Sequence, residues 1–548
     1  MNETERDPVL TVDGLTVSLP MSGDRPYAVE DLTFRVDVGE IVCIVGESGS
    51  GKSVTAFTTM GLLPKALKPS SGRMIFEGRD ILTMRPREHA RLRGNRMAMI
   101  FQEPMTSLNP CFTVGDQIEE VFQAHSNISR AERKAKTIAL MEEVHLPEVE
   151  RIYRSYPHEL SGGQRQRIVI AIALAMNPSL LIADEPTTAL DVTTQAQILL
   201  LMKRLKDTHG AGILFVTHDF DVVAEIADRV IVMQTGRIVE QGPAQVVLSN
   251  PQHPYTRQLI AAVPPRRAVE PPPLPADAKT ILEVKGLTKT FNVARTLLSP
   301  ARSVHAVRPT SFSLKVGETL GIVGESGSGK TTLVRTLIRL IEPDSGETLI
   351  DGTDFAKLSK DKLRRFRSQI QIVFQDPYGS LNPRRTIGDQ LVSAPINFGM
   401  AKAKAWSQAH ELMRVVRLNP EVLGRYPSQF SGGQRQRICI ARALMMAPKI
   451  LIADEAVSAL DVSVQKEVLQ LLKDVRDHMG LTMLFITHDL RVAAQISDRI
   501  AVMKDGEIVE IGTARAVFEH STNDYTKSLL ASMPGMNWDV PQIKPVSA

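Results

Sequence analysis

The sequence predicts two tandem α/β domains, each built around a mainly parallel β-sheet. The chain has 548 residues. This is too long for a single hydrophobic core, because single cores stop growing near roughly 250 to 300 residues. The second half repeats the motifs of the first half in the same order. Apolar runs of strand length recur in both halves, as is typical of strands that helices cover on both faces. The repeat is too long for a solenoid and indicates a duplicated domain.

The composition excludes several other classes of protein. The chain is 43% hydrophobic and 23% charged, as in ordinary globular proteins and unlike disordered or collagen-like chains. Its longest apolar run, residues 168–176, is far shorter than the about 20 residues of a membrane-spanning helix. Residues 1–7 carry acids where a signal peptide has basic and apolar regions, so we expect an unexported chain.

The net charge and the positions of the cysteines exclude further kinds of partner and site. The net charge is +4, from 65 basic and 61 acidic residues, which is small for a chain that neutralises many nucleic-acid phosphates. We therefore expect no nucleic-acid partner. Cys43, Cys111 and Cys439 form no Cys-x-x-Cys pair, so neither a disulfide framework nor a zinc site is predicted. We expect buried or otherwise inert thiols.

Three segments are predicted along the chain. Residues 1–263 form the first domain with a short C-terminal extension, and residues 280–548 form the second domain with its own extension. Residues 264–279 between them are rich in proline. Because proline cannot donate to a helix or a sheet, this segment is predicted to be an extended, semi-rigid linker.

The secondary structure follows from the apolar pattern. Each copy opens its core with an apolar strand that leads into a glycine loop and then an apolar helix. Further buried strands are predicted where apolar runs recur, at 180–183 and 213–216 in the first copy and 450–453 and 483–486 in the second. Amphipathic helices are predicted at 131–146 and 402–418, the second with a core-facing stripe of Trp406, Ala409, Met413 and Val416.

The glycine loops follow the opening strands, 41–45 and 319–323. Gly46-Glu-Ser-Gly-Ser-Gly-Lys52-Ser53 recurs as Gly324-Glu-Ser-Gly-Ser-Gly-Lys330-Thr331. This pattern between a strand and a helix is the phosphate-binding loop, in which backbone N–H groups converge on nucleotide phosphates. We expect the lysines to reach the β- and γ-phosphates and the final hydroxyls to bind Mg²⁺. The candidate ATP-binding residues here are Gly46, Ser48, Gly49, Ser50, Gly51, Lys52, Ser53 and Val54, and Gly324, Ser326, Gly327, Ser328, Gly329, Lys330, Thr331 and Thr332.

Acidic residues and histidines end the later strands. Parallel strands present their carboxyl ends at one edge of a sheet, where ligands bind. We expect the aspartates there to hold Mg²⁺ and the following glutamates to deprotonate the attacking water, worth on the order of 10² to 10⁴ in rate. The histidines would bridge the γ-phosphate and that water. These residues are Asp184, Glu185 and His218 in the first copy, and Asp454, Glu455 and His488 in the second.

A second glycine-rich motif precedes a long helical pattern in each copy. Its serine is predicted to cap that helix, and its loop to form a second anion site. The residues are Ser161, Gly162, Gly163 and Gln164, and Ser431, Gly432, Gly433 and Gln434.

Together these motifs resemble the ATP-binding cassette (ABC) family over nearly the whole chain, twice. The resemblance implies two tandem P-loop NTPase domains, each with a mainly parallel sheet, a helical subdomain and an antiparallel β part. It also implies that the cassettes pair head-to-tail within one chain, so that the Ser-Gly-Gly-Gln signature of one closes on ATP held by the other. One site would pair Lys52 with Ser431, and the other Lys330 with Ser161. The linker would keep the cassettes at high effective concentration.

Other positions match the family one by one. Gln102 and Gln375 resemble the glutamines that sense Mg²⁺ beside the surface contacting the membrane subunits. Asp191 and Asp461 resemble the loop that couples the two sites.

Two positions depart from the family or from the other copy. Tyr27 stands where the family stacks an aromatic ring on adenine, but His305 takes that place in the second copy, which implies weaker or different stacking there. Ala456 replaces the proline found at Pro186. Neither change removes a catalytic group, so both sites are expected to hydrolyse ATP.

Several short sequence segments resemble those of the oligopeptide/dipeptide branch of bacterial ABC importers, in its fused, peptide/microcin-type form. The matching segments are residues 102–110, 375–383, 156–161 and 251–256, and residues 523–526 match more weakly. The resemblance implies an ATP-hydrolysing peripheral subunit on the cytoplasmic face of the inner membrane, powering uptake of peptides or related small solutes. Its partners would be two integral-membrane permeases and a periplasmic substrate-binding protein. No cysteine follows Cys439, so no iron–sulfur cluster is expected.

One alternative from another class is a soluble tandem-cassette ATPase that acts on ribosomes. Proteins of that class usually join their cassettes by a long, charged, helical linker. The linker here is short and proline-rich, which favours the importer.

Overall fold

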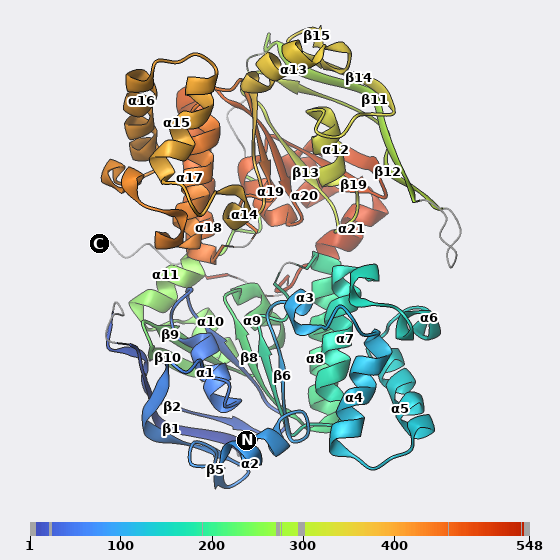
Figure 1. The fold of residues 1–548 in the computed structure, drawn as a ribbon, viewed down its shortest axis with the longest axis vertical. Helices are drawn as coiled ribbons and strands as arrows, with labels where there is room; N and C mark the ends of the chain where they lie inside the picture. Colours follow the sequence, from blue (N-terminus) through green and yellow to red (C-terminus); the bar gives the residue numbers. More distant parts are fainter. Residues whose placement is uncertain are drawn as a thin grey trace. The chain divides into compact units, whose positions relative to one another are not determined.

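The computed structural model describes residues 7–20, 25–188, 190–269, 275, 277–293, 302–458, 460–536, 538 and 540–541. The chain forms two compact units, Met1–Val263 with Met533–Ala548, and Pro264–Ser532 (Figure 1). Residues 1–6, and residues 270–274 and 276 of the expected linker, lie outside the described residues. Where the linker is described, the Gln495 amide donates to the carbonyl oxygens of Pro265 and Arg267, so this stretch packs on the second unit.

The first unit contains two β-sheets. The antiparallel sheet has the order β2-β1-β4-β5 and the larger sheet the order β10-β9-β3-β8-β7-β6, in which only β10 runs antiparallel. The strands are β1 (Pro8–Ser18), β2 (Tyr27–Asp37), β3 (Ile41–Val45), β4 (Lys68–Phe76), β5 (Arg79–Asp80), β6 (Met97–Ile100), β7 (Leu180–Asp184), β8 (Gly212–Thr217), β9 (Arg229–Gln234) and β10 (Arg237–Pro243).

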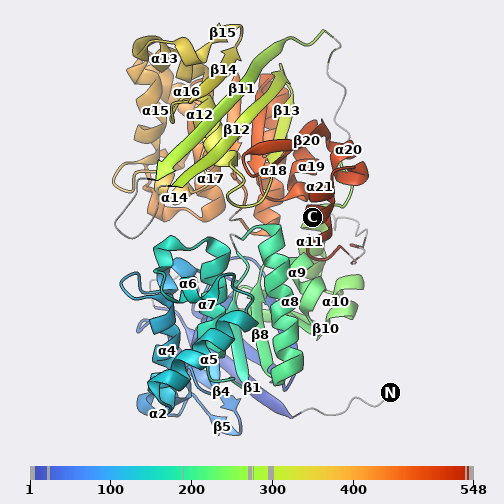
Figure 2. The same ribbon diagram turned by 90° about the vertical axis from the view of Figure 1, so that its right-hand side faces the viewer.

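Helices surround the larger sheet of the first unit, and α4 to α7 gather on one side of the sheets as a helical subdomain (Figures 1 and 2). The helices are α1 (Lys52–Thr59), α2 (Pro86–Leu92), α3 (Pro104–Ser107), α4 (Val114–His125), α5 (Arg130–Glu143), α6 (Val149–Tyr153), η1 (Pro157–Glu159), α7 (Gly162–Leu174), α8 (Val192–His209), α9 (Phe220–Ile226), α10 (Ala244–Ser249) and α11 (Pro254–Ala262).

The second unit repeats both sheets, in the orders β12-β11-β14-β15 and β16-β17-β18-β13-β19-β20. Its strands are β11 (Thr280–Val293), β12 (Arg302–Lys315), β13 (Thr319–Val323), β14 (Ser345–Ile350), β15 (Thr353–Asp354), β16 (Ile370–Val373), β17 (Ile450–Asp454), β18 (Thr482–Thr487), β19 (Arg499–Lys504) and β20 (Glu507–Thr513).

Helices of the second unit follow the same plan. They are α12 (Lys330–Leu337), η2 (Phe355–Lys357), α13 (Lys360–Phe366), η3 (Arg367–Gln369), α14 (Pro377–Ser380), α15 (Ile387–Asn397), α16 (Lys402–Val415), η4 (Pro420–Gly424), η5 (Pro427–Gln429), α17 (Gly432–Leu444), α18 (Val462–Met479), α19 (Leu490–Ile496), α20 (Ala514–His520) and α21 (Asp524–Ala531). The predicted fold class, two α/β cassettes with a mainly parallel sheet, is confirmed.

The predicted elements are confirmed closely. The strands at 41–45 and 319–323 match β3 and β13, and the four later apolar runs lie inside β7, β8, β17 and β18, all paired in parallel. The amphipathic helices are α5 and α16, each ending about one turn earlier than expected. On α16, the predicted stripe is buried at Ala409 and Met413 and half-buried at Trp406.

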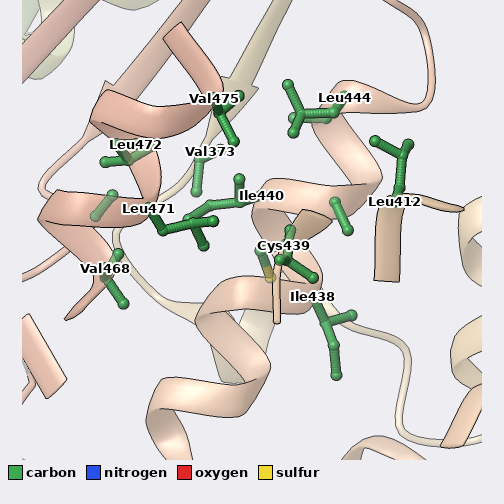
Figure 3. Packing of buried hydrophobic residues seen from close by; sticks show 14 of the residues in the cluster. Val373, Leu412, Ile438, Cys439, Ile440, Leu444, Val468, Leu471, Leu472 and Val475 are labelled. Atoms are coloured by element: carbon green, nitrogen blue, oxygen red, sulfur yellow. The ribbon is translucent and has the colours of Figure 1, made fainter. Parts of the chain in front are cut away.

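The packing of the second unit shows why these apolar runs form its core. Figure 3 shows side chains of α17, such as Ile440, facing side chains of α18, such as Leu471 and Val475. Cys439 lies in the same cluster and is 1% exposed, and this burial raises the pKa of its thiol to about 11. Cys43 is also buried, whereas Cys111 is exposed. Among the described residues, no helix is long and apolar enough to cross a membrane.

Candidate ATP-hydrolysis sites

Each phosphate loop, 46–53 or 324–331, joins a buried strand to the start of a helix. Gly51 and Gly329 precede α1 and α12 with φ angles of 102° and 99°, a left-handed conformation that glycine adopts without steric cost. A Cβ atom on Gly46 would lie 2.2 Å from the Met233 carbonyl oxygen. Glycine at these positions therefore allows the loop to turn tightly against the neighbouring strand.

The loop lysines lie inside the loops. Lys52 is 5% exposed, and its Nζ donates to the carbonyl oxygens of Gly46 at 2.7 Å and Glu47 at 3.0 Å. Lys330 repeats both contacts, to Gly324 at 2.6 Å and Glu325 at 2.8 Å. Each loop therefore holds one positive charge at the start of a helix, where the helix dipole also favours an anion.

The aspartates lie at the carboxyl ends of β7 and β17. The Ser53 hydroxyl donates to Asp184 Oδ1 at 3.2 Å. Asp454 Oδ1 is buried and has no hydrogen-bond partner among the described residues. Burial, with a smaller contribution from the adjacent glutamate, raises the pKa of each aspartate to about 6.

These residues fit a magnesium ion. The first unit places the Ser53 hydroxyl against the Asp184 carboxylate, and the second has a buried Asp454 oxygen without a partner among the described residues. Hard oxygen ligands of this kind are those that Mg²⁺ prefers. In the part of the chain that the structure describes, no group of three or more His, Cys, Asp or Glu side chains could hold a metal ion. A magnesium site here would combine hydroxyl and carboxylate oxygens with water and phosphate.

Glu185 has three polar neighbours around its side-chain carboxylate, at the same edge of the sheet. Its φ angle of 48° is left-handed, and its N–H donates to the Val216 carbonyl oxygen at 2.9 Å. Gln102 Nε2 and the Thr188 hydroxyl each donate to Oε2 at 2.9 Å. His218 Nδ1 lies 3.3 Å from Oε1.

Glu455 has the same setting in the second unit. Its φ angle is 47°, Gln375 Nε2 donates to Oε2 at 2.7 Å, and His488 Nδ1 lies 3.6 Å from that oxygen. The structure therefore brings glutamate and histidine together twice, as the sequence predicts. It also places each glutamine against the glutamate, a contact that sequence reasoning missed.

The histidines determine the charge of the glutamates. Burial alone would raise the pKa of Glu185, but hydrogen bonding and the positive charge of His218 outweigh burial and lower the pKa to about 2. For Glu455, burial likewise raises the pKa and His488 lowers it, and the net effect is a lowered pKa. Each glutamate is therefore ionised at neutral pH and can accept a hydrogen bond, or a proton, from water.

The signature serines cap their helices, as predicted. The Ser161 hydroxyl accepts from the Gln164 N–H at 3.3 Å, and the Gln164 side chain accepts from the Ser161 N–H at 3.0 Å. Ser431 and Gln434 make the same capping box at the start of α17.

The remaining predicted residues lie at or near the beginnings of helices and strands. Asp191 caps α8 by accepting from the Thr194 N–H at 2.9 Å, and Asp461 stands at the corresponding start of α18. Tyr27 begins β2 and is half-buried. His305 lies on β12, is exposed, and its Nδ1 lies 3.1 Å from the Thr290 hydroxyl.

Two tyrosines that sequence reasoning missed contact the phosphate loops. The Tyr255 hydroxyl accepts from the Glu47 N–H at 3.2 Å, and the Tyr525 hydroxyl donates to Glu325 Oε2 at 3.2 Å. The available signal was the Tyr-Thr pair that follows each cassette, at Tyr255 and Tyr525.

Two family models match the chain, each in both halves. The model described as ABC transporter matches residues 29–188 and 307–458. The model described as Oligopeptide/dipeptide transporter, C-terminal region, matches residues 239–284 and 509–546. The second model follows the first in each copy, where sequence reasoning placed a C-terminal extension.

Similar proteins include the glutathione import ATP-binding protein GsiA of Escherichia coli O157:H7, which is 47% identical over 564 residues, covering 97% of this chain and 90% of that protein. GsiA of Escherichia coli (strain K12) is 47% identical over 569 residues with the same coverage. A dimeric ATP-binding cassette solved in a post-hydrolysis state with ADP and phosphate is 32% identical, covering 43% of this chain and 99% of that chain, with a TM-score of 0.39. The chain thus belongs to the ABC transporter family, as a tandem-cassette ATP-hydrolysing subunit of the oligopeptide/dipeptide importer branch.

Proposed function

We propose that the two cassettes hydrolyse ATP to power uptake of a small peptide or a peptide-like solute. The observation that carries this proposal is the doubled oligopeptide/dipeptide C-terminal region, attached to two cassettes that each contain the full set of catalytic groups. The relatives are named for glutathione import, and glutathione is therefore the first cargo to test. The same doubled region favours an importer over a ribosome-acting ATPase.

In each site, the loop lysine binds the nucleotide phosphates, and the neighbouring oxygen ligands hold Mg²⁺. These ligands are Ser53, Asp184 and Gln102 in the first unit, and Thr331, Asp454 and Gln375 in the second. When bound, the ion neutralises charge on the phosphates. Tyr27 stacks on adenine in the first unit, whereas His305 supplies a smaller ring in the second.

Hydrolysis uses the ionised glutamates. Glu185 and Glu455 orient a water molecule and accept its proton, while His218 and His488 hold the carboxylates in place and contact the γ-phosphate. Both glutamates are ionised and both are held by a glutamine. We therefore propose that both sites are catalytic.

The two sites form between the cassettes. Lys52 would act with the signature at Ser431, and Lys330 with the signature at Ser161, while Asp191 and Asp461 couple the sites. Residues 264–279 keep the cassettes at high effective concentration. The movement is passed to two integral-membrane permeases near Gln102 and Gln375, at the cytoplasmic face of the inner membrane, and a periplasmic binding protein supplies the cargo.

The proposal is tested by purifying the tagged chain from detergent-solubilised membranes and identifying what accompanies it. Two multi-spanning permeases are expected, and the assembled complex should hydrolyse ATP faster when a binding protein loaded with glutathione is added. A Glu185→Gln, Glu455→Gln chain should assemble equally well without hydrolysis. Recovery of ribosomes with no membrane partner would overturn the transport assignment.

A further inference from the structure

The helix that follows each cassette reaches back to the phosphate loop of the same unit. Tyr255 lies on α11 and its hydroxyl accepts a hydrogen bond from the N–H of Glu47, which is 208 residues away in the chain. Tyr525 lies on α21 and its hydroxyl donates to the carboxylate of Glu325, which is 200 residues away. Glu47 and Glu325 are the second residues of the two loops. A tyrosine of the extension thus contacts the same loop residue in both copies, through its backbone N–H in the first and through its side-chain carboxylate in the second.

In the first unit, hydrogen bonds fix the N-terminal end of α11, where Tyr255 lies. Tyr255 is 6% exposed, and its N–H donates to Nδ1 of the capping residue His253 at 3.2 Å. The N–H groups of Gln252 and His253 donate to the carboxylate of Glu240 on β10, at 2.7 and 3.1 Å. The tyrosine is therefore anchored to the last strand of the sheet.

In the second unit, different residues anchor the corresponding tyrosine, Tyr525. Asn523 caps α21 by accepting from the Tyr525 N–H at 2.9 Å, and its amide donates to the Val509 carbonyl oxygen on β20 at 3.2 Å. Lys504 Nζ lies 4.7 Å from the centre of the Tyr525 ring. Burial and the charge of Glu325 raise the pKa of Tyr525, so its hydroxyl keeps the proton that it donates.

The residue that each tyrosine contacts also contacts the loop lysine. The carbonyl oxygen of Glu47 accepts from Lys52 Nζ at 3.0 Å, and that of Glu325 accepts from Lys330 Nζ at 2.8 Å. One loop residue therefore connects the tyrosine of the extension to the lysine that binds phosphate. In the first unit the tyrosine contact is made to the backbone of that residue, so its loss would act directly on the backbone beside the lysine. In the second unit it would act through the Glu325 side chain.

We propose that Tyr255 and Tyr525 are positioning residues that hold the phosphate loops in the conformation that binds ATP. Through them, the helices α11 and α21 set the ATP affinity of their cassettes. This inference rests on the proposed function in one respect, that these loops bind ATP. The tyrosines touch no reacting atom, so they act on binding and leave the hydrolytic step unchanged.

The experiment removes one hydroxyl at a time from the full chain. MgATP affinity is measured for Tyr255→Phe in a chain that also carries Lys330→Ala, so that binding reports the first loop, and for Tyr525→Phe in a Lys52→Ala chain. A buried hydrogen bond of this kind corresponds to about a three- to tenfold loss of affinity. With both lysines intact, the phenylalanine variants should show a raised KM for ATP and a kcat within about twofold of the original, as expected for lost positioning.

Tyr153→Phe is the matched control, because it removes a tyrosine hydroxyl from a glutamate, Glu119, in the helical subdomain. It should leave ATP affinity unchanged. Unaltered affinity in the Tyr255 and Tyr525 variants, an equal loss in Tyr153→Phe, or a lower kcat at constant KM would each overturn the inference. ATP binding that survives Lys52→Ala with Lys330→Ala would instead show that the loops are not the nucleotide sites, which is a failure of the proposed function.

Discussion

His218 Nδ1 lies 3.3 Å from Glu185 Oε1, and this pair joins residues that follow two neighbouring parallel strands, β8 and β7. The corresponding pair in the second unit, His488 and Glu455, is 3.6 Å apart. Each glutamate is also held by a glutamine from a third segment. The two units therefore build the same group of glutamate, histidine and glutamine, each at the carboxyl edge of its own mainly parallel sheet.

Glu185→Gln and Glu455→Gln should each lower ATP turnover. Glutamine keeps the shape and one acceptor oxygen but cannot accept a proton, so the double variant should lose on the order of 10²-fold or more. Steady-state phosphate release measures turnover, and retained MgATP affinity shows that binding is intact. A single variant with unchanged turnover would mean that its site is not catalytic.

Pairing of the cassettes can be tested by combining substitutions. If Lys52 and Ser431 serve one site, Lys52→Ala with Ser431→Ala disables that site alone, whereas Lys52→Ala with Ser161→Ala disables both. We expect turnover to be about tenfold lower or more in the second combination, because residues in one site are not additive. The outcome that contradicts the head-to-tail arrangement is the reverse order of the two combinations.

Asp184→Asn should stabilise the chain at high pH in the absence of magnesium. The folded pKa of about 6 is above the ordinary value of 3.8, so the folded state is penalised once this carboxyl ionises. The gain should be absent below about pH 4, grow towards pH 6 and reach at most about 3 kcal/mol above it.

Thermal unfolding in a chelator, at about pH 4.5 and about pH 8, measures this gain. Asp207→Asn is the control, because Asp207 is exposed on α8 and its substitution should give no comparable pH-dependent gain. Equal melting temperatures of Asp184→Asn and the original chain at both pH values would contradict the prediction.

Cys111 should be the one thiol that reacts in the native chain. It is exposed, whereas Cys43 and Cys439 are buried, and burial raises the pKa of both buried thiols, so the reactive thiolate is scarce. A thiol-reactive chromophore should modify one cysteine in buffer and three in denaturant. Cys111→Ser should abolish the native reaction, and rapid modification of the buried thiols would count against the core packing.

Gly388→Ala should destabilise the second helical subdomain. A Cβ atom at this position of α15 would lie 2.4 Å from Cη2 of Trp406, and overpacking of this kind costs about 1 to 3 kcal/mol. Denaturant unfolding measures the loss. Gly424→Ala, whose added Cβ meets nothing within 4 Å, is the control and should unfold like the original chain.

Local features of the fold were predictable because they depend on neighbouring residues. The strand at 41–45 is a continuous apolar run bounded by polar residues and glycine, and it matches β3. The Ser161 cap follows from a serine with glutamine three residues later, a capping box that closes within one turn. The position of the strand-end carboxylates was predictable as well, because the carboxyl ends of parallel strands share an edge.

Contacts between distant segments were not predictable in the same way. Gln102 lies 83 residues from Glu185, and Tyr255 lies 208 residues from Glu47. No local pattern specifies such partners, because they depend on the strand order and on where the extension helix docks. The exposure of Cys111 beside two buried cysteines likewise depends on packing.

The sequence by itself therefore determined the duplication, the strand–loop–helix segments, the position of the carboxylates at the strand ends and the family. These are encoded in short motifs whose chemistry depends on adjacent residues. Only the tertiary structure decided which side chains hold the glutamates, and that each extension helix reaches its phosphate loop through a tyrosine. Those contacts form only when the sheet brings remote segments within hydrogen-bond distance, so their residues carry no recognisable spacing along the chain.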